Sequence, residues 1–157
     1  MGRRGRRAAA AATLLGVVLL AGCGGGSKSG RLSKAAYEQK LKAEGAQLQA
    51  ATSGFTVQVN NLKTLSKKLA VLQPKIEGAA KDFDSFRPPV NAVADNKKIA
   101  DVLHKLADLF GQMKSAADSH DLTKLQQDVA QLRALGSEGT TATDDLKAKG
   151  YKVGKFG

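Results

Sequence analysis

The sequence predicts an all-α fold, an antiparallel bundle of three to four helices over residues 33–157. Ala and Lys, which suit helices, are abundant, whereas runs of β-branched residues are few. Apolar residues recur at spacings of three and four, as they do on one face of a helix. Glycine and proline divide the chain into segments of helical length. Aromatic residues make up only 4% and Trp is absent, so the core must be mainly aliphatic.

The first predicted helix runs from about Ser33 to Ser53. Ser33 is a suitable N-cap, because its hydroxyl can accept a hydrogen bond from a free backbone N–H of the first turn. Gly54 can adopt the left-handed conformation that ends many helices. The residues that share the apolar face are Tyr37, Leu41, Gly45, Leu48 and Thr52.

The second predicted helix runs from about Phe55 to Phe86 and keeps its three-four pattern throughout. The pattern passes Pro74 without losing phase, which predicts one kinked helix rather than two. Arg87-Pro88-Pro89 ends it, because a residue before proline is pushed out of the α region. Its apolar positions are Phe55, Val59, Leu62, Leu65, Leu69, Leu72, Ile76, Ala79, Phe83 and Phe86.

The third predicted helix runs from about Asn91 to Asp118. Its apolar stripe is wider than a two-stranded seam needs, which predicts contact with two neighbouring helices. The stripe consists of Ile99, Val102, Leu103, Leu106, Leu109, Phe110, Met113 and Ala117.

The fourth predicted helix runs from about Leu122 to Lys149, with Asp121 as its cap. The segment "GSEGTT" at residues 136–141 weakens it, and the sequence leaves open whether the helix breaks there. Gly150 is expected to end it in a Schellman motif, which brings Leu146 and Tyr151 together.

The N-terminal residues have the pattern of an export signal. Residues 1–7, "MGRRGRR", are basic, and the mostly apolar run at 8–21 is too short to span a bilayer. Basic flank and apolar run together are typical of a cleaved signal peptide over residues 1–22.

The residues Leu20-Ala21-Gly22-Cys23 resemble the lipobox of bacterial lipoproteins. The resemblance implies a diacylglyceryl group on the Cys23 sulfur and cleavage between Gly22 and Cys23. It also implies a lipid-anchored protein on the outer face of the bacterial cell membrane. Residues 23–32 then form the lipidated cysteine and a flexible Gly/Ser tether.

Other interpretations of this segment are weaker. Cys23 is the only cysteine, so a disulfide would have to be intermolecular, and an uncleaved cysteine beside a membrane anchor also remains open. The paired arginines leave the twin-arginine export route open. Residues 22–29 differ at Ser27 from a phosphate-binding P-loop and follow an export signal rather than a buried strand, which argues against nucleotide binding.

The formal charge of +11 is unevenly distributed. Without the four arginines of residues 1–7, 21 basic residues face 14 acidic ones, a balance of +7. This charge suits anionic lipid headgroups or envelope polymers, and it equally suits plain solubility. The lysines are scattered among acids, without an aromatic-rich reader motif, so no nucleic-acid partner is expected.

Candidate catalytic groups are few. His104 has Asp101 and Asp108 at helical spacings, which would suit weak metal binding, but an exposed surface cluster is the preferred interpretation. The carboxylates of Asp82 and Asp84 lie two residues apart and those of Asp144 and Asp145 one apart, so each pair points to different helix faces. We therefore expect no metal, no cofactor and no enzymatic activity.

The segments "LSKAAYEQKLKAEGAQL", "FRPPVNAVADNKKIADVLHKL" and "LKAKGYKVG" resemble small helical lipoproteins of uncharacterised role from high-GC bacteria. This resemblance implies no functional residues. The first hypothesis is therefore a membrane-anchored, non-enzymatic binding or interaction module with an unidentified partner. A carrier of a small apolar ligand or lipid between the helices is the alternative, and an enzyme with a metal site at His104 is the third hypothesis.

Overall fold

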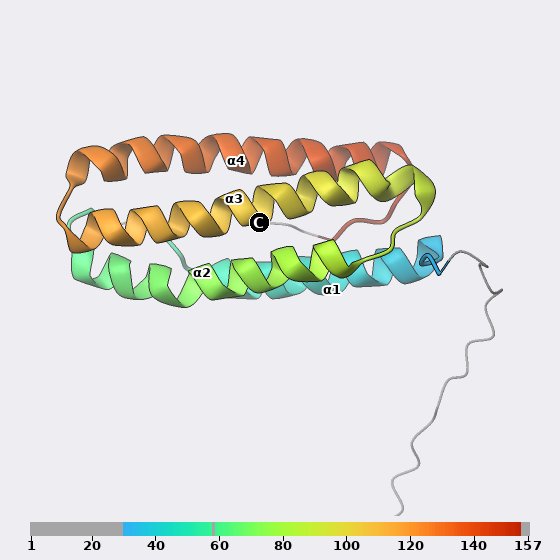
Figure 1. Ribbon diagram of the computed structural model, residues 1–157, viewed down its shortest axis with the longest axis horizontal. Helices are drawn as coiled ribbons and strands as arrows, with labels where there is room; N and C mark the ends of the chain where they lie inside the picture. The colour runs from blue at the N-terminus through green and yellow to red at the C-terminus, as the bar shows by residue number, and fades with distance from the viewer. Residues whose placement is uncertain (1–29, 58, 155–157) are drawn as a thin grey trace, which may run out of the picture.

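The computed structural model describes residues 30–57 and 59–154, and within these ranges the chain is helical without a strand. Figure 1 shows α-helices α1 (Lys34–Thr52), α2 (Leu62–Ser85), α3 (Val93–Asp118) and α4 (Leu122–Ala148), with the 3-10 turn η1 (Val90–Ala92) before α3. The predicted all-α bundle is confirmed. The predicted signal peptide and Cys23 lie outside the described residues.

Helix α1 has the predicted boundaries. The Ser33 hydroxyl accepts a hydrogen bond from the Ala36 backbone N–H at 3.2 Å. After the helix, Gly54 has a φ of 73°, in the left-handed region that glycine adopts without steric cost. Both local signals therefore act as the sequence indicates.

Helix α2 begins later than predicted, at Leu62 rather than Phe55. Asn61 caps it by accepting the Thr64 N–H at 3.0 Å, so the local capping signal overrides the apolar periodicity before it. Phe55 instead packs from the loop onto Phe110, with ring centroids 5.6 Å apart. The helix continues through Pro74, as predicted.

A Schellman-type turn, which the sequence did not predict, joins α3 to α4. His120 has a φ of 59°, and the Asp121 N–H bonds to the Ala116 carbonyl at 2.9 Å. Asp121 then caps α4, as expected, by accepting the Lys124 N–H at 2.9 Å.

Helix α4 is continuous through residues 136–141, which settles the question that the sequence left open. Its end matches the predicted motif, since Gly150 has a φ of 77° and the Tyr151 N–H bonds to the Leu146 carbonyl at 3.0 Å. Both Leu146 and Tyr151 are buried.

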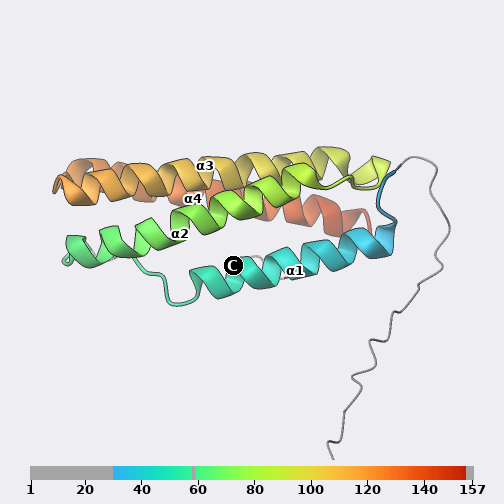
Figure 2. The ribbon, with the colours of Figure 1, turned by 60° about the horizontal axis from the view of Figure 1, so that its bottom comes forward.

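Helix α3 is the central element of the bundle. It packs against α2 along one side and α4 along the other, which explains its wide apolar stripe, while α1 lies along α2 (Figure 2). Among the described residues, the buried apolar side chains and those packed on them fall within residues 32–153. None of the helices described is both long and apolar enough to cross a bilayer.

The two ends of the bundle differ. The proximal end holds the start of α1, the α2–α3 turn and the end of α4, and it is where the chain enters (Figure 1). Polar contacts join elements there: the buried Asn96 side chain accepts from the Tyr37 hydroxyl, and Lys149, at the end of α4, pairs with the buried Asp95 at 2.5 Å. The distal end holds the α1–α2 loop and the α3–α4 turn.

Candidate functional site

An apolar cavity of about 190 Å³ lies inside the bundle. All four helices contribute to this interhelical cavity, which separates α1 from α4. The residues that line it are Leu48, Thr52, Ile76, Ile99, Val102, Leu103, Leu106, Leu132, Leu135, Gly136, Gly139, Thr140 and Thr143. No charged side chain is among them, so the cavity suits an uncharged occupant.

The polar groups of the cavity wall are already satisfied by the backbone. The Thr52 hydroxyl donates to the Leu48 carbonyl at 2.8 Å, and Thr140 donates to the Gly136 carbonyl at 2.9 Å. Thr143 donates to the Thr140 carbonyl at 2.8 Å. With these donors engaged, shape and apolar contact would decide what binds.

Two glycines keep the α4 side of the cavity open. A Cβ atom at Gly136 would meet nothing within 4 Å, and one at Gly139 would lie 3.6 Å from the Val102 side chain, an ordinary contact. Alanine would therefore fit at both positions. Glycine in a helix interior lowers the stability of the helix by about 1 kcal/mol relative to alanine, so the two glycines are not there for local stability. Gly136 and Thr140 are exposed, so the cavity opens to solvent between them.

The sequence signal for this cavity was the "GSEGTT" segment itself. By itself this segment indicates only a weak point in the helix, because the distance from α4 to α1 cannot be inferred from either segment alone. The sequence feature that could have indicated the cavity is the presence of Gly136 and Gly139 on a helix that otherwise carries Leu125, Leu132 and Leu135 toward the core.

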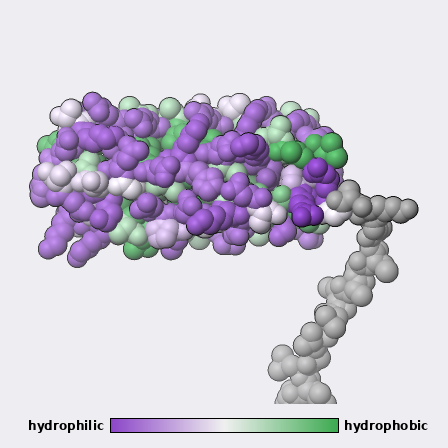
Figure 3. All heavy atoms as spheres, in the orientation of Figure 1, coloured by the Kyte–Doolittle hydropathy of each residue, from purple (hydrophilic) through white to green (hydrophobic). Residues whose placement is uncertain are grey.

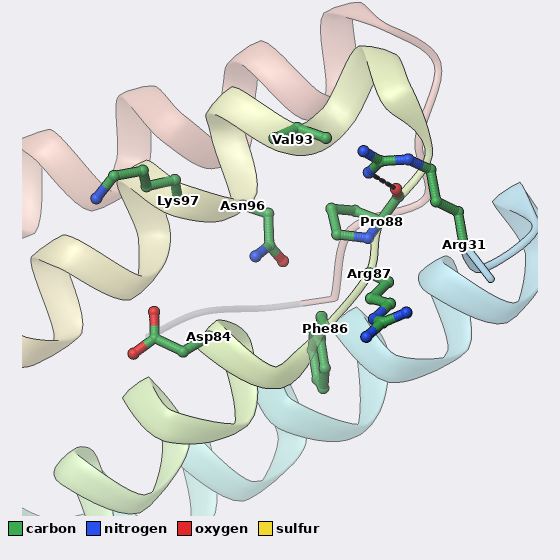
Figure 4. Close-up of a pocket in the computed structure, with 8 residues that line it drawn as sticks. All are labelled: Arg31, Asp84, Phe86, Arg87, Pro88, Val93, Asn96 and Lys97. Carbon is green, nitrogen blue, oxygen red and sulfur yellow. Dashed lines mark hydrogen bonds between the residues drawn. The ribbon is translucent and has the colours of Figure 1, made fainter. Parts of the chain in front are cut away.

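A second, open pocket of about 490 Å³ lies at the proximal end (Figure 4). Its lining consists of Arg31, Asp84, Phe86, Arg87, Pro88, Val93, Asn96 and Lys97. Arg31 Nη1 donates to the Pro88 carbonyl at 3.1 Å, and the Leu32 N–H donates to the Arg87 carbonyl at 2.7 Å. These bonds fasten the segment before α1 to the α2–α3 turn.

His104 does not pair with Asp101 or Asp108, the neighbours that its helical spacing offers. Its Nε2 lies 2.8 Å from Asp84 Oδ2 and its Nδ1 lies 3.3 Å from Glu77 Oε2, and both carboxylates belong to α2. Asp101 instead pairs with Lys97 at 2.8 Å. Sequence spacing shows only neighbours on the same helix, so the cross-helix partners could not be seen.

The other acidic candidates do not converge either. Asp144 pairs with Lys147 at 2.7 Å, whereas its neighbour Asp145 pairs with Lys98 on α3 at 3.0 Å. Among residues 30–57 and 59–154, no group of three His, Cys, Asp or Glu side chains is arranged to hold a metal ion.

Comparisons with known proteins give no family or relative. No protein-family model, no curated protein and no solved structure matches this chain.

The His104 contacts predict a pH dependence. The hydrogen bond to Asp84, followed by that to Glu77, raises the pKa of His104 above its ordinary value of about 6.5. A raised folded-state pKa stabilises the fold below about pH 6.5, and this contribution is lost as the pH rises through the folded-state pKa. Urea unfolding of the wild type should therefore show a small fall in stability from about pH 6 to pH 8.

His104→Gln should remove this fall and leave the stability flat over the same pH range. His120→Gln is the matched control and should keep the wild-type fall. An unchanged pH dependence in His104→Gln would contradict the assignment.

Proposed function

We propose that the chain is a membrane-anchored envelope lipoprotein whose helical bundle is a non-enzymatic binding module. The observation that carries the proposal is the position of Cys23, after an apolar run with a lipobox-like ending and before a glycine-rich segment. A thiol with no partner cysteine in the chain suits attachment to lipid. Two or more acyl chains on one residue give stable anchoring, whereas a single chain holds only marginally.

The arrangement of the bundle supports this proposal. The described core lies within residues 32–153, and the described chain enters at one end of the bundle. A tether from Cys23 to Gly30 would thus join the bundle at that end. Several charged groups of the described surface, Lys98 and Lys105 among them, are engaged in ion pairs.

Lipidation can be tested directly in bacterial cells. Radiolabelled palmitate should enter the wild-type chain and should be absent from Cys23→Ala, because the thioether cannot form without the sulfur. Ser27→Ala is the control and should be labelled like the wild type. Labelling of Cys23→Ala would refute the lipoprotein assignment.

A second candidate function is carriage of a small apolar ligand, and the interhelical cavity favours it. The cavity of 190 Å³ is similar in size to the roughly 150 Å³ cavity that admits benzene in an engineered protein. It could hold one ring or a short stretch of an acyl chain, with the rest of the ligand passing out between Gly136 and Thr140. The absence of charged groups in its lining agrees with a hydrocarbon occupant.

The cavity glycines give a test that separates binding from folding. Gly136→Ala and Gly139→Ala should each raise the free energy of unfolding by about 0.5–1 kcal/mol, because alanine favours the helix. Gly139→Leu should fill the cavity and abolish the fluorescence that cis-parinaric acid gains on binding. Gly78→Ala is the control for stability without loss of binding, because a Cβ atom at this exposed α2 position also meets nothing within 4 Å and Gly78 does not line the interhelical cavity.

Equal parinaric acid binding by Gly139→Leu and the wild type would exclude the cavity as the site. If the wild type does not bind parinaric acid, the carrier function is refuted and the anchored binding module stands as the one proposed function.

A further inference from the structure

The α2–α3 turn presents apolar side chains to solvent at the proximal end. Val90, directly after Pro88 and Pro89, is 76% exposed, and Val93, the first residue of α3, is 39% exposed. Figure 3 shows hydrophobic surface at the end of the bundle where the chain enters. The two prolines restrict the backbone of the turn, so Val90 is held outward at little further entropic cost.

Two arginines flank this turn without an acidic partner. Arg31 and Arg87 lie on either side of Pro88 (Figure 4), and within the described ranges no carboxylate forms an ion pair with either. The other charges of the pocket are engaged, since Lys97 pairs with Asp101 and Asp84 contacts His104. The uncompensated charge of the pocket is therefore that of the two guanidinium groups.

The covalent chain restricts where this end can lie. Gly30 is seven positions after Cys23, and extended chain spans at most about 3.6 Å per residue, so the start of the bundle lies within roughly 25 Å of Cys23. Helix α3, at about 1.5 Å per residue, places the distal end roughly 39 Å farther along the bundle. A lipid on Cys23 would thus keep the proximal end nearest the bilayer.

We propose that the proximal end docks on an anionic phospholipid surface, with Val90 entering the headgroup region and Arg31 and Arg87 contacting lipid phosphates. This inference rests on the proposed lipid anchor and adds an orientation to it. Arg guanidinium groups match phosphate geometry, and an exposed aliphatic residue in the same turn as a basic residue suits the boundary between headgroups and acyl chains. In this orientation the bundle stands on its proximal end, and α4 extends away from the bilayer. The cavity mouth on α4 therefore lies above the bilayer surface.

The absence of Trp from the chain allows a direct test. The chain from Cys23 onward, which contains the whole described core, is coupled through its only cysteine to a maleimide phospholipid in phosphatidylglycerol vesicles with brominated acyl chains. Val90→Trp should be strongly quenched by the bromine atoms. Leu122→Trp is the matched probe, 50% exposed at the distal end, and should keep its fluorescence.

The arginines are tested in the Val90→Trp background. Two basic groups near an anionic surface correspond to roughly a thirtyfold shift of the docking equilibrium, so Arg31→Gln/Arg87→Gln should lose most of the quenching. The control double variant Lys63→Gln/Lys67→Gln removes the same charge from exposed distal positions and should retain the quenching. Circular dichroism melting of both double variants shows whether the fold is intact.

Equal quenching at positions 90 and 122, equal losses from the two double variants, or no loss from either would each overturn the proposal. The coupling is chemical, so the result is independent of whether cells lipidate Cys23. Failure of palmitate labelling would refute the natural anchor, whereas failure of the quenching test would refute the orientation alone.

Discussion

One buried chain of hydrogen bonds joins three of the four helices. The Tyr37 hydroxyl of α1 donates to Asn96 Oδ1 of α3 at 3.1 Å, and Asn96 Nδ2 donates to the Phe83 carbonyl of α2 at 2.8 Å. Tyr37 is fully buried and Asn96 is 6% exposed. A buried polar group left without its partner costs about 1–3 kcal/mol, so these contacts fix the register of α1 against the α2–α3 pair.

The surroundings of this chain strengthen the proximal end. Burial, followed by the nearby Asp95, raises the pKa of Tyr37, so its hydroxyl remains a donor throughout the physiological range. The Tyr37 ring meets that of Tyr151 edge to face, with centroids 5.6 Å apart. The second half of α1 has no comparable polar link, and Leu48 and Thr52 there border the interhelical cavity. One end of α1 is therefore fastened, whereas the other forms a wall of the candidate binding site.

Local signals in the sequence predicted local structure well. Ser33, Asp121 and Gly150 end or begin helices as their chemistry requires, and the wide stripe of α3 correctly indicated two neighbours. Features that depend on distant residues were beyond sequence reasoning. Phe55 continued a helical period but packs from a loop on Phe110, and His104 found its partners on α2. The space beside Gly136 and Gly139 exists only because α1 and α4 are held apart, which no single segment reveals.

The division of α1 into a fastened half and a cavity-lining half is the central structural claim, and the candidate carrier function depends on it. Native-state hydrogen exchange of the wild type and Asn96→Ala tests it most directly. The amides that follow Tyr37 should exchange more slowly than those near Leu48 and Thr52, and Asn96→Ala should abolish this difference while much of the protection of α3 remains. Uniform protection along α1 in the wild type, or an unchanged pattern in Asn96→Ala, would contradict the account.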